Sequence, residues 1–198
     1  MLLSEQILVS FLFTSFFVVS LLVYRPKNFS ELCGSSFAFI FAIGCLFALK
    51  EGLSQTAYVA ICLLWIPLTV DDAINQNVSA KLLYSATAVT VILSVVVQHR
   101  SILDVFIVAL SIFCVFCLVK YLESRVNKVL IGDADYYACL AFVSILPVSA
   151  IGIWLTIFPL LAILGFFVSY RVSQQIPMLP YMLAGWCLVF TWVNSVGY

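Results

Sequence analysis

Charged residues are scarce in this chain. Lys, Arg, Asp and Glu make up 9% of its 198 residues, whereas an average soluble domain has roughly 25%. The formal net charge is zero and no long basic run occurs, so nothing in the composition indicates a nucleic-acid-binding surface. Hydrophobic residues make up 65% of the chain. This composition predicts an all-α polytopic membrane protein without a separate soluble domain.

Histidine is nearly absent, because His99 is the single one in the chain. A metalloprotease helix needs two His residues one turn apart together with a Glu, so that chemistry is excluded. A Ser–His protease needs a His near a Gly-flanked Ser. We expect His99 to lie beside Arg100 in a short loop, on the opposite membrane side from the acidic residues discussed below. Carboxylates are therefore the remaining candidates for catalysis.

The cysteines do not suggest a disulfide framework, because they number seven and most fall inside apolar runs. Cys114 and Cys117 have CxxC spacing but no second Cys or His pair nearby. We expect these two residues to pack as small hydrophobic side chains and not to bind a metal. The sequence predicts neither a metal nor another cofactor.

Eight apolar runs separated by polar breaks predict a single domain over residues 1–198, a bundle of about eight transmembrane helices. The first run, Ile7 to Tyr24, lacks a basic segment before it and a small-residue cleavage site, so we expect a retained helix. The predicted helices are Glu5–Tyr24, Ser35–Leu49, Ser54–Val70, Ala80–Val97, Ile102–Val119, Tyr136–Ile151, Trp154–Tyr170 and Met178–Val196.

Basic residues are distributed unevenly between alternate loops of this topology. One side holds Arg25, Lys27, Lys81, Lys120, Arg125, Lys128 and Arg171, and the other holds Lys50 and Arg100. The positive-inside rule makes the first side cytoplasmic and places both chain ends outside. The loop from Lys120 to Ala134 is then cytoplasmic, and we expect a helix extension followed by a turn at Gly132.

Two acidic pairs adjoin apolar runs on this cytoplasmic side. Asp71-Asp72 ends one run, and Gly132-Asp133-Ala134-Asp135 opens another. Carboxylates are costly near hydrocarbon, so their presence there indicates a functional site. Two facing carboxylates can hydrolyse a peptide bond, because their repulsion keeps one protonated as an acid and leaves the other ionised as a base. Alternatively, Asp135 is a helix N-cap and Asp72 a solvated interfacial residue.

Three motifs resemble one family in their order. Gly132-Asp133-Ala134-Asp135 looks like the GxGD motif, in its GxAD form, of the type IV prepilin leader peptidases, which are membrane aspartyl proteases. Val78-Ser79-Ala80 follows Asp72 at the spacing of that family's aliphatic-Pro-Asn triplet. The segment Ile176 to Gly185, IPMLPYMLAG, resembles the family's IPFGPFLALG stretch. The resemblance covers roughly Leu53 to Gly185, and Tyr137 replaces the Lys usual in the family.

The resemblance implies a membrane aspartic endopeptidase of the bacterial inner membrane. Its substrate would be a prepilin or pseudopilin of a pilus or secretion system, with a basic leader and a hydrophobic helix. Asp72 and Asp135 would be the catalytic pair, and the near-site residues would be Asp71, Asp133, Gly132, Ala134, Pro177 and Pro180. The loop from Arg25 to Gly34 holds the single Cys33, so the zinc site and methyltransferase activity of longer family members are not expected.

Several alternatives stay open at this point. The chain could be a transporter or channel that uses interfacial carboxylates, or an inactive subunit of a pilus or secretion assembly. A presenilin-like GxGD protease is a third alternative, but its Pro-Ala-Leu motif does not occur. Asp71 could replace Asp72 as the first catalytic residue. Gly132 could allow close approach of a substrate, adopt a positive φ or cap a helix C-terminus, and Pro177 and Pro180 could simply begin the last helix.

Overall fold

A computed structural model describes residues 3–27, 29–48, 53–97, 101–126, 132–169 and 177–196, and within these ranges all regular structure is helical. The helices are α1 (Leu3–Tyr24), α2 (Phe29–Ala48), α3 (Leu53–Asn75), α4 (Ala80–Val97), α5 (Ile102–Val126), α6 (Asp133–Ile145), α7 (Val148–Ser169) and α8 (Leu179–Val196). The predicted all-α bundle is therefore confirmed for the described part of the chain, which contains eight helices.

Three helices contain segments that are long and apolar enough to cross a membrane. They are Gln55–Asn75 in α3, Ile102–Arg125 in α5 and Val148–Gly165 in α7. Very few residues of the α5 segment are buried within the bundle, as expected for a helix that faces lipid. These segments support a membrane protein.

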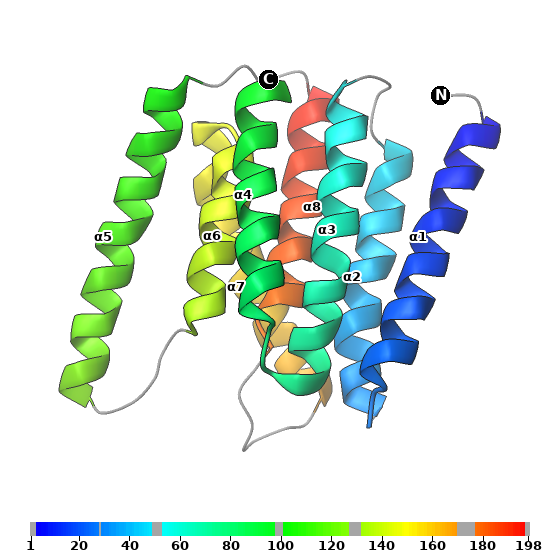
Figure 1. Ribbon diagram of the computed structural model, residues 1–198, viewed down its shortest axis with the longest axis horizontal. Coiled ribbons are helices and arrows are strands. Elements are labelled where there is room, and N and C mark those ends of the chain that lie inside the picture. Colours follow the sequence, from blue (N-terminus) through cyan, green and yellow to red (C-terminus); the bar gives the residue numbers. More distant parts are fainter. Residues whose placement is uncertain are drawn as a thin grey trace.

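The helices run alternately up and down the bundle (Figure 1). The start of α1 and the end of α8 lie at one end of the bundle. The end of α3 and the starts of α4, α6 and α8 lie at the other end, which we call the pocket end. Segments far apart in the sequence thus bring their helix ends together at the pocket end.

Aromatic side chains fill the core between α3, α6, α7 and α8. Trp65, Trp154 and Trp186 are fully buried, and the Trp186 ring stacks on that of Tyr58 at a centroid distance of 5.5 Å. The indole Nε1 of Trp154 donates a hydrogen bond to the carbonyl oxygen of Met182 at 3.1 Å, which joins α7 to α8. Rigid packing of this kind fixes the positions of the helix ends.

Several predicted helix boundaries were wrong, although Ala80–Val97 was correct. Hydrophobicity located the apolar runs, but a helix continues for as long as its backbone hydrogen bonds are made. Accordingly α3 extends past Val70, and α5 extends past Val119. The predicted Tyr136–Ile151 helix instead ends at Ile145, because Leu146 precedes Pro147 and adopts an extended conformation with φ −85° and ψ 141°. The remaining bounds also differ, with α2 starting at Phe29 and α7 at Val148.

Candidate active site

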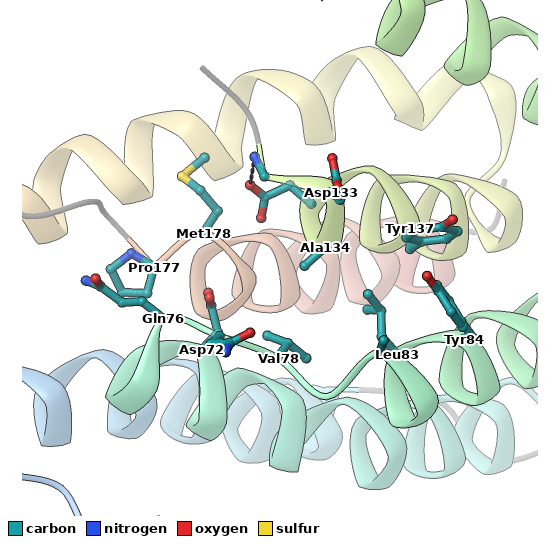
Figure 2. Close-up of a pocket in the computed structure, with 14 residues that line it drawn as sticks. Asp72, Gln76, Val78, Leu83, Tyr84, Asp133, Ala134, Tyr137, Pro177 and Met178 are labelled. Carbon is teal, nitrogen blue, oxygen red and sulfur yellow. Dashed lines mark hydrogen bonds between the residues drawn. The ribbon is translucent and has the colours of Figure 1, made fainter. Parts of the chain in front are cut away.

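A pocket of about 590 Å³ lies at the pocket end, between the end of α3 and the starts of α4, α6 and α8 (Figure 2). Its lining residues are Asp72, Gln76, Asn77, Val78, Ala80, Leu83, Tyr84, Gly132, Asp133, Ala134, Asp135, Tyr137, Pro177 and Met178. The pocket therefore brings together residues from all three motifs of the sequence.

Asp72 lies in the last turn of α3 and faces the pocket (Figure 2). Its Oδ2 atom accepts a hydrogen bond from the backbone N–H of Leu179, the first residue of α8, at 3.0 Å. Gln76 has a positive φ of 53°, and its N–H donates to the Asp72 carbonyl at 3.0 Å. The left-handed residue ends α3 and turns the chain toward α4, while Asp72 stays on a regular helix. The expectation that Asp72 follows the helix end is corrected accordingly.

Asp71 does not line the pocket. Its side chain is 6% exposed, and its Oδ1 atom accepts a hydrogen bond from Asn75 Nδ2 at 2.7 Å, one turn further along α3. Neighbouring residues of a helix point about 100° apart, so only one of the two carboxylates can face the pocket. That residue is Asp72. Asp71 adjoins it on α3 but does not line the pocket, so Asp72 is the residue of this pair that shares the pocket with Asp135.

Asp135 is the third residue of α6. Its Oδ2 atom accepts a hydrogen bond from the N–H of Gly132 at 3.1 Å (dashed line in Figure 2), and its own N–H donates to the Gly132 carbonyl at 3.1 Å. This is the acidic half of a capping box, in which Gly132 is the N-cap residue. Asp135 is therefore not itself the N-cap.

Gly132 has φ −69° and ψ 153°, an extended conformation that most residues can adopt. A positive φ at Gly132 is thus excluded, and so is a role as helix C-cap, because the residue precedes α6. A Cβ atom at this position would lie 3.3 Å from Asp135 Oδ2. The absence of a side chain at Gly132 therefore leaves room for the Asp135 carboxylate.

Burial raises the pKa of Asp135 from its usual value of 3.8 to about 6, and the hydrogen bond from the Gly132 backbone opposes part of that rise. Removal from water disfavours the charged carboxylate, and a backbone donor favours it. Asp135 can therefore exchange a proton close to neutral pH, as general acid–base catalysis requires.

Asp133 and Ala134 occupy different parts of the pocket wall. The Asp133 side chain is 78% exposed, and its Oδ1 atom lies 3.0 Å from Lys120 Nζ. Lys120 also pairs with Glu123 on α5 at 3.0 Å. Ala134 lies between Asp72 and Tyr137 in Figure 2. Asp133 is thus a solvated, paired carboxylate at the rim.

The two prolines at the start of α8 have different positions. Pro177 lines the pocket, whereas Pro180 is buried in the first turn of α8 and does not line it. Proline fits this turn because the first N–H groups of a helix have no acceptor within it. Pro180 directly follows Leu179, whose N–H binds Asp72, but it does not contribute to the pocket wall.

Sequence reasoning missed much of the wall. Gln76 and Asn77 come four and five residues after Asp72, so proximity in sequence could have indicated them. Met178 lies in the third motif, Ile176 to Gly185, although it was not singled out there. No sequence signal pointed to Tyr84, because its position depends on how α4 packs against α6. Tyr137 was noted only as a departure from the family pattern, and it lines the pocket beside Tyr84.

Some expectations concern other parts of the chain. His99, Arg100, Lys128 and Ile176 lie outside the described residues. Cys114 and Cys117 are exposed on α5, so their expected core packing was wrong, because α5 lies at the edge of the bundle. Within the part of the chain that the structure describes, no three His, Cys, Asp or Glu residues are grouped to hold a metal ion.

The described chain is thus a helical bundle with membrane-length helices and a pocket at one end that is lined by Asp72, Asp133 and Asp135. Comparisons with protein-family models, curated proteins and solved structures find no match to it. Function therefore has to be argued from the pocket and from the motifs that meet there.

Proposed function

We propose that this protein is a membrane aspartic endopeptidase, similar to the type IV prepilin leader peptidases. The observation that supports this most directly is the meeting of Asp72 and Asp135 in one pocket, from α3 and α6. Two carboxylates around one water-accessible cavity are what an aspartic peptidase needs to activate water.

Hydrolysis would begin with water held between the two side chains. The ionised carboxylate takes a proton from the water as its oxygen attacks the carbonyl carbon, and the protonated partner donates a proton to the carbonyl oxygen. The C–N bond then breaks, and the amine leaves with a proton. The pair shares its protons, so acid and base roles belong to the dyad as a unit.

Backbone donors hold both carboxylates in place. Leu179 N–H binds Asp72, and Gly132 N–H binds Asp135, each through an Oδ2 atom. Each donor lies at the start of a helix, where the helix dipole favours a negative charge. A carboxylate accepts about four hydrogen bonds, so both groups keep capacity for water and substrate.

The proposed substrate is a prepilin or pseudopilin whose basic leader lies in the cytoplasm and whose apolar helix lies in the bilayer. Its scissile bond would lie at the membrane surface, where the pocket end opens. The chain would cross a bacterial inner membrane with all eight helices. Arg25 directly follows α1, and Lys81 and Arg125 lie in the first turn of α4 and the last turn of α5. These three helix ends lie at the pocket end, which supports a cytoplasmic pocket.

Co-expression with prepilins encoded in the same genome tests this proposal. Loss of the leader is followed by gel mobility and mass for wild type and for Asp72→Asn, Asp135→Asn and Asp71→Asn. Cleavage that Asp72→Asn and Asp135→Asn abolish, and that Asp71→Asn retains, supports the dyad. An intact leader with wild-type protein for every prepilin tried would count against peptidase activity.

A further inference from the structure

The pocket has two chemically different ends. Asp72, Gln76 and Pro177 lie at one end in Figure 2, and Tyr84 and Tyr137 lie at the other. Three apolar lining residues, Val78, Leu83 and Ala134, lie between Asp72 and the tyrosines in Figure 2. A peptide that placed its scissile bond at the dyad would therefore place a neighbouring side chain against the apolar end.

Tyr84 and Tyr137 form a ring pair on the wall. Their ring centroids lie 4.8 Å apart with an interplanar angle of 65°, the edge-to-face arrangement that aromatic rings favour. Thr87 Oγ1 donates to the Tyr137 carbonyl at 3.4 Å, which ties α4 to α6 beside the pair. The Tyr84 side chain is nevertheless 52% exposed, so its ring remains accessible to a ligand.

The depth of the pair indicates which part of a substrate it meets. Tyr84 and Tyr137 are each the fifth residue of a helix that starts at the pocket end. They lie about 6 Å further into the bundle than those helix starts, at 1.5 Å rise per residue. The substrate's apolar helix continues in that direction, whereas its basic leader stays outside.

We infer that Tyr84 and Tyr137 form a specificity subsite for a large apolar side chain directly on the membrane side of the scissile bond. This inference rests on the proposed peptidase function. Tyrosine rings also attract cations. A basic side chain would instead bind at the carboxylate end, because the dyad carries negative charge there. The tyrosines are positioning residues, since water activation remains with the dyad.

Binding of uncleavable peptides tests the subsite without requiring catalysis. The probes carry a basic leader, a Gly, then Phe or Ala, and an apolar helix, with a hydroxyethylene group in place of the scissile amide. Wild type should bind the Phe peptide about tenfold more tightly than the Ala peptide in detergent micelles, a typical gain for filling an apolar subsite. Tyr84→Ala and Tyr137→Ala should reduce this preference to about twofold or less, because less apolar surface is buried.

Matched variants separate the subsite from general effects. Tyr84→Phe and Tyr137→Phe keep the rings and should keep the preference. Tyr121→Ala removes an exposed tyrosine of α5 outside the pocket and should also keep it. Because Tyr84 is half exposed, its replacement by Ala disturbs little packing. Tyr84→Ala therefore decides the test even where Tyr137→Ala does not fold.

The outcomes distinguish this inference from the proposed function. Equal binding of both peptides by wild type, a preference that Tyr84→Ala retains, or no binding of either peptide overturns the subsite. Cleavage of the matching amide peptides by wild type is measured alongside. A Tyr-dependent preference without cleavage refutes the peptidase and keeps the subsite, whereas cleavage without any preference refutes the subsite alone.

Discussion

Asp72 Oδ2 accepts a hydrogen bond from Leu179 N at 3.0 Å, so the last turn of α3 is joined to the first residue of α8. The N–H groups of a first helical turn lack acceptors within their own helix. The Asp72 carboxylate, from a distant part of the sequence, supplies an acceptor for the first N–H group of α8. The carboxylate that we propose as catalytic therefore also stabilises the start of α8, and the two roles can be separated by substitution.

Asp72→Asn should abolish leader cleavage with little loss of stability, because the Asn side-chain oxygen can still accept from Leu179 but cannot take up a proton. We expect at least about a 100-fold loss of activity. Asp72→Ala should also be inactive and in addition lower the free energy of unfolding by about 1 kcal/mol, a typical cost of losing a helix cap. Equilibrium unfolding in mixed micelles measures the difference. Equal stability of the two variants would contradict the capping role.

Asp135 should make the stability of the protein depend on pH. Its pKa is raised from 3.8 in the unfolded chain to about 6 in the folded one, so the folded state binds more protons between these values. The free energy of unfolding should therefore fall as pH rises from about 4 to about 6, by roughly 2 kcal/mol, and then level off. Asp135→Asn should lack this contribution. The measurement is the free energy of unfolding against pH for wild type and Asp135→Asn. Parallel curves between about pH 4 and about pH 6 would refute the raised pKa of Asp135.

The helices were predictable because long apolar runs leave few alternatives in a chain with so little charge. Their ends were not, because hydrogen bonds that involve polar residues determine them. Asp71 and Asp72 looked like loop residues, yet α3 continues through both to Asn75. Hydropathy therefore cannot show at which residue the backbone hydrogen bonds of a helix stop.

The candidate site was partly predictable through the motif resemblance, which indicated Asp72, Asp135, Gly132 and Pro177. Which of two adjacent carboxylates faces inward depends on the rotation of α3, and spacing favoured Asp72 without excluding Asp71. Tyr84 carried no sequence signal at all. Its place in the pocket follows from the packing of α4 against α6, a tertiary contact that no local pattern encodes.

Gly132→Ala should impair cleavage more than stability. The backbone angles permit Ala, but its Cβ atom would lie 3.3 Å from Asp135 Oδ2 and displace that carboxylate. Small displacements of catalytic groups are costly, and we expect about a tenfold loss of activity. Gly44→Ala is the matched control, because no atom lies within 4 Å of its added Cβ. Equal cleavage rates for both variants and wild type would show that Gly132 does not position Asp135.

Gly185→Ala should destabilise the contact between α7 and α8. The added Cβ atom would lie 3.0 Å from Phe158 Cβ and 3.2 Å from Phe158 Cα, so two helix backbones would have to separate. Overpacking of this kind costs about 1–3 kcal/mol. Gly152→Ala on α7 meets no atom within 4 Å and should be neutral or slightly stabilising. Equilibrium unfolding in mixed micelles measures the stability of both variants. Equal changes in the free energy of unfolding would mean that α7 and α8 do not pack tightly at Gly185.

Cleavage should depend on the positive charge of the substrate leader. Among the described residues that line the pocket are the carboxylates Asp72, Asp133 and Asp135, and none is Lys or Arg. Replacing the leader lysines by glutamine should therefore lower kcat/KM several-fold at 10 mM salt. The effect should shrink at 150 mM salt, where the screening length falls from about 30 to about 8 Å.

The part that Asp133 plays in this attraction can be isolated, because its side chain is 78% exposed at the rim. In Asp133→Asn the same lysine replacements should cost less than they do in wild type, since part of the attracting charge is already gone. The comparison requires kcat/KM for two substrates and two enzymes at both salt concentrations. If the lysine replacements lower kcat/KM equally in wild type and Asp133→Asn, Asp133 does not contribute to the attraction. If they do not change kcat/KM at low salt in wild type, the leader is not recognised by its charge.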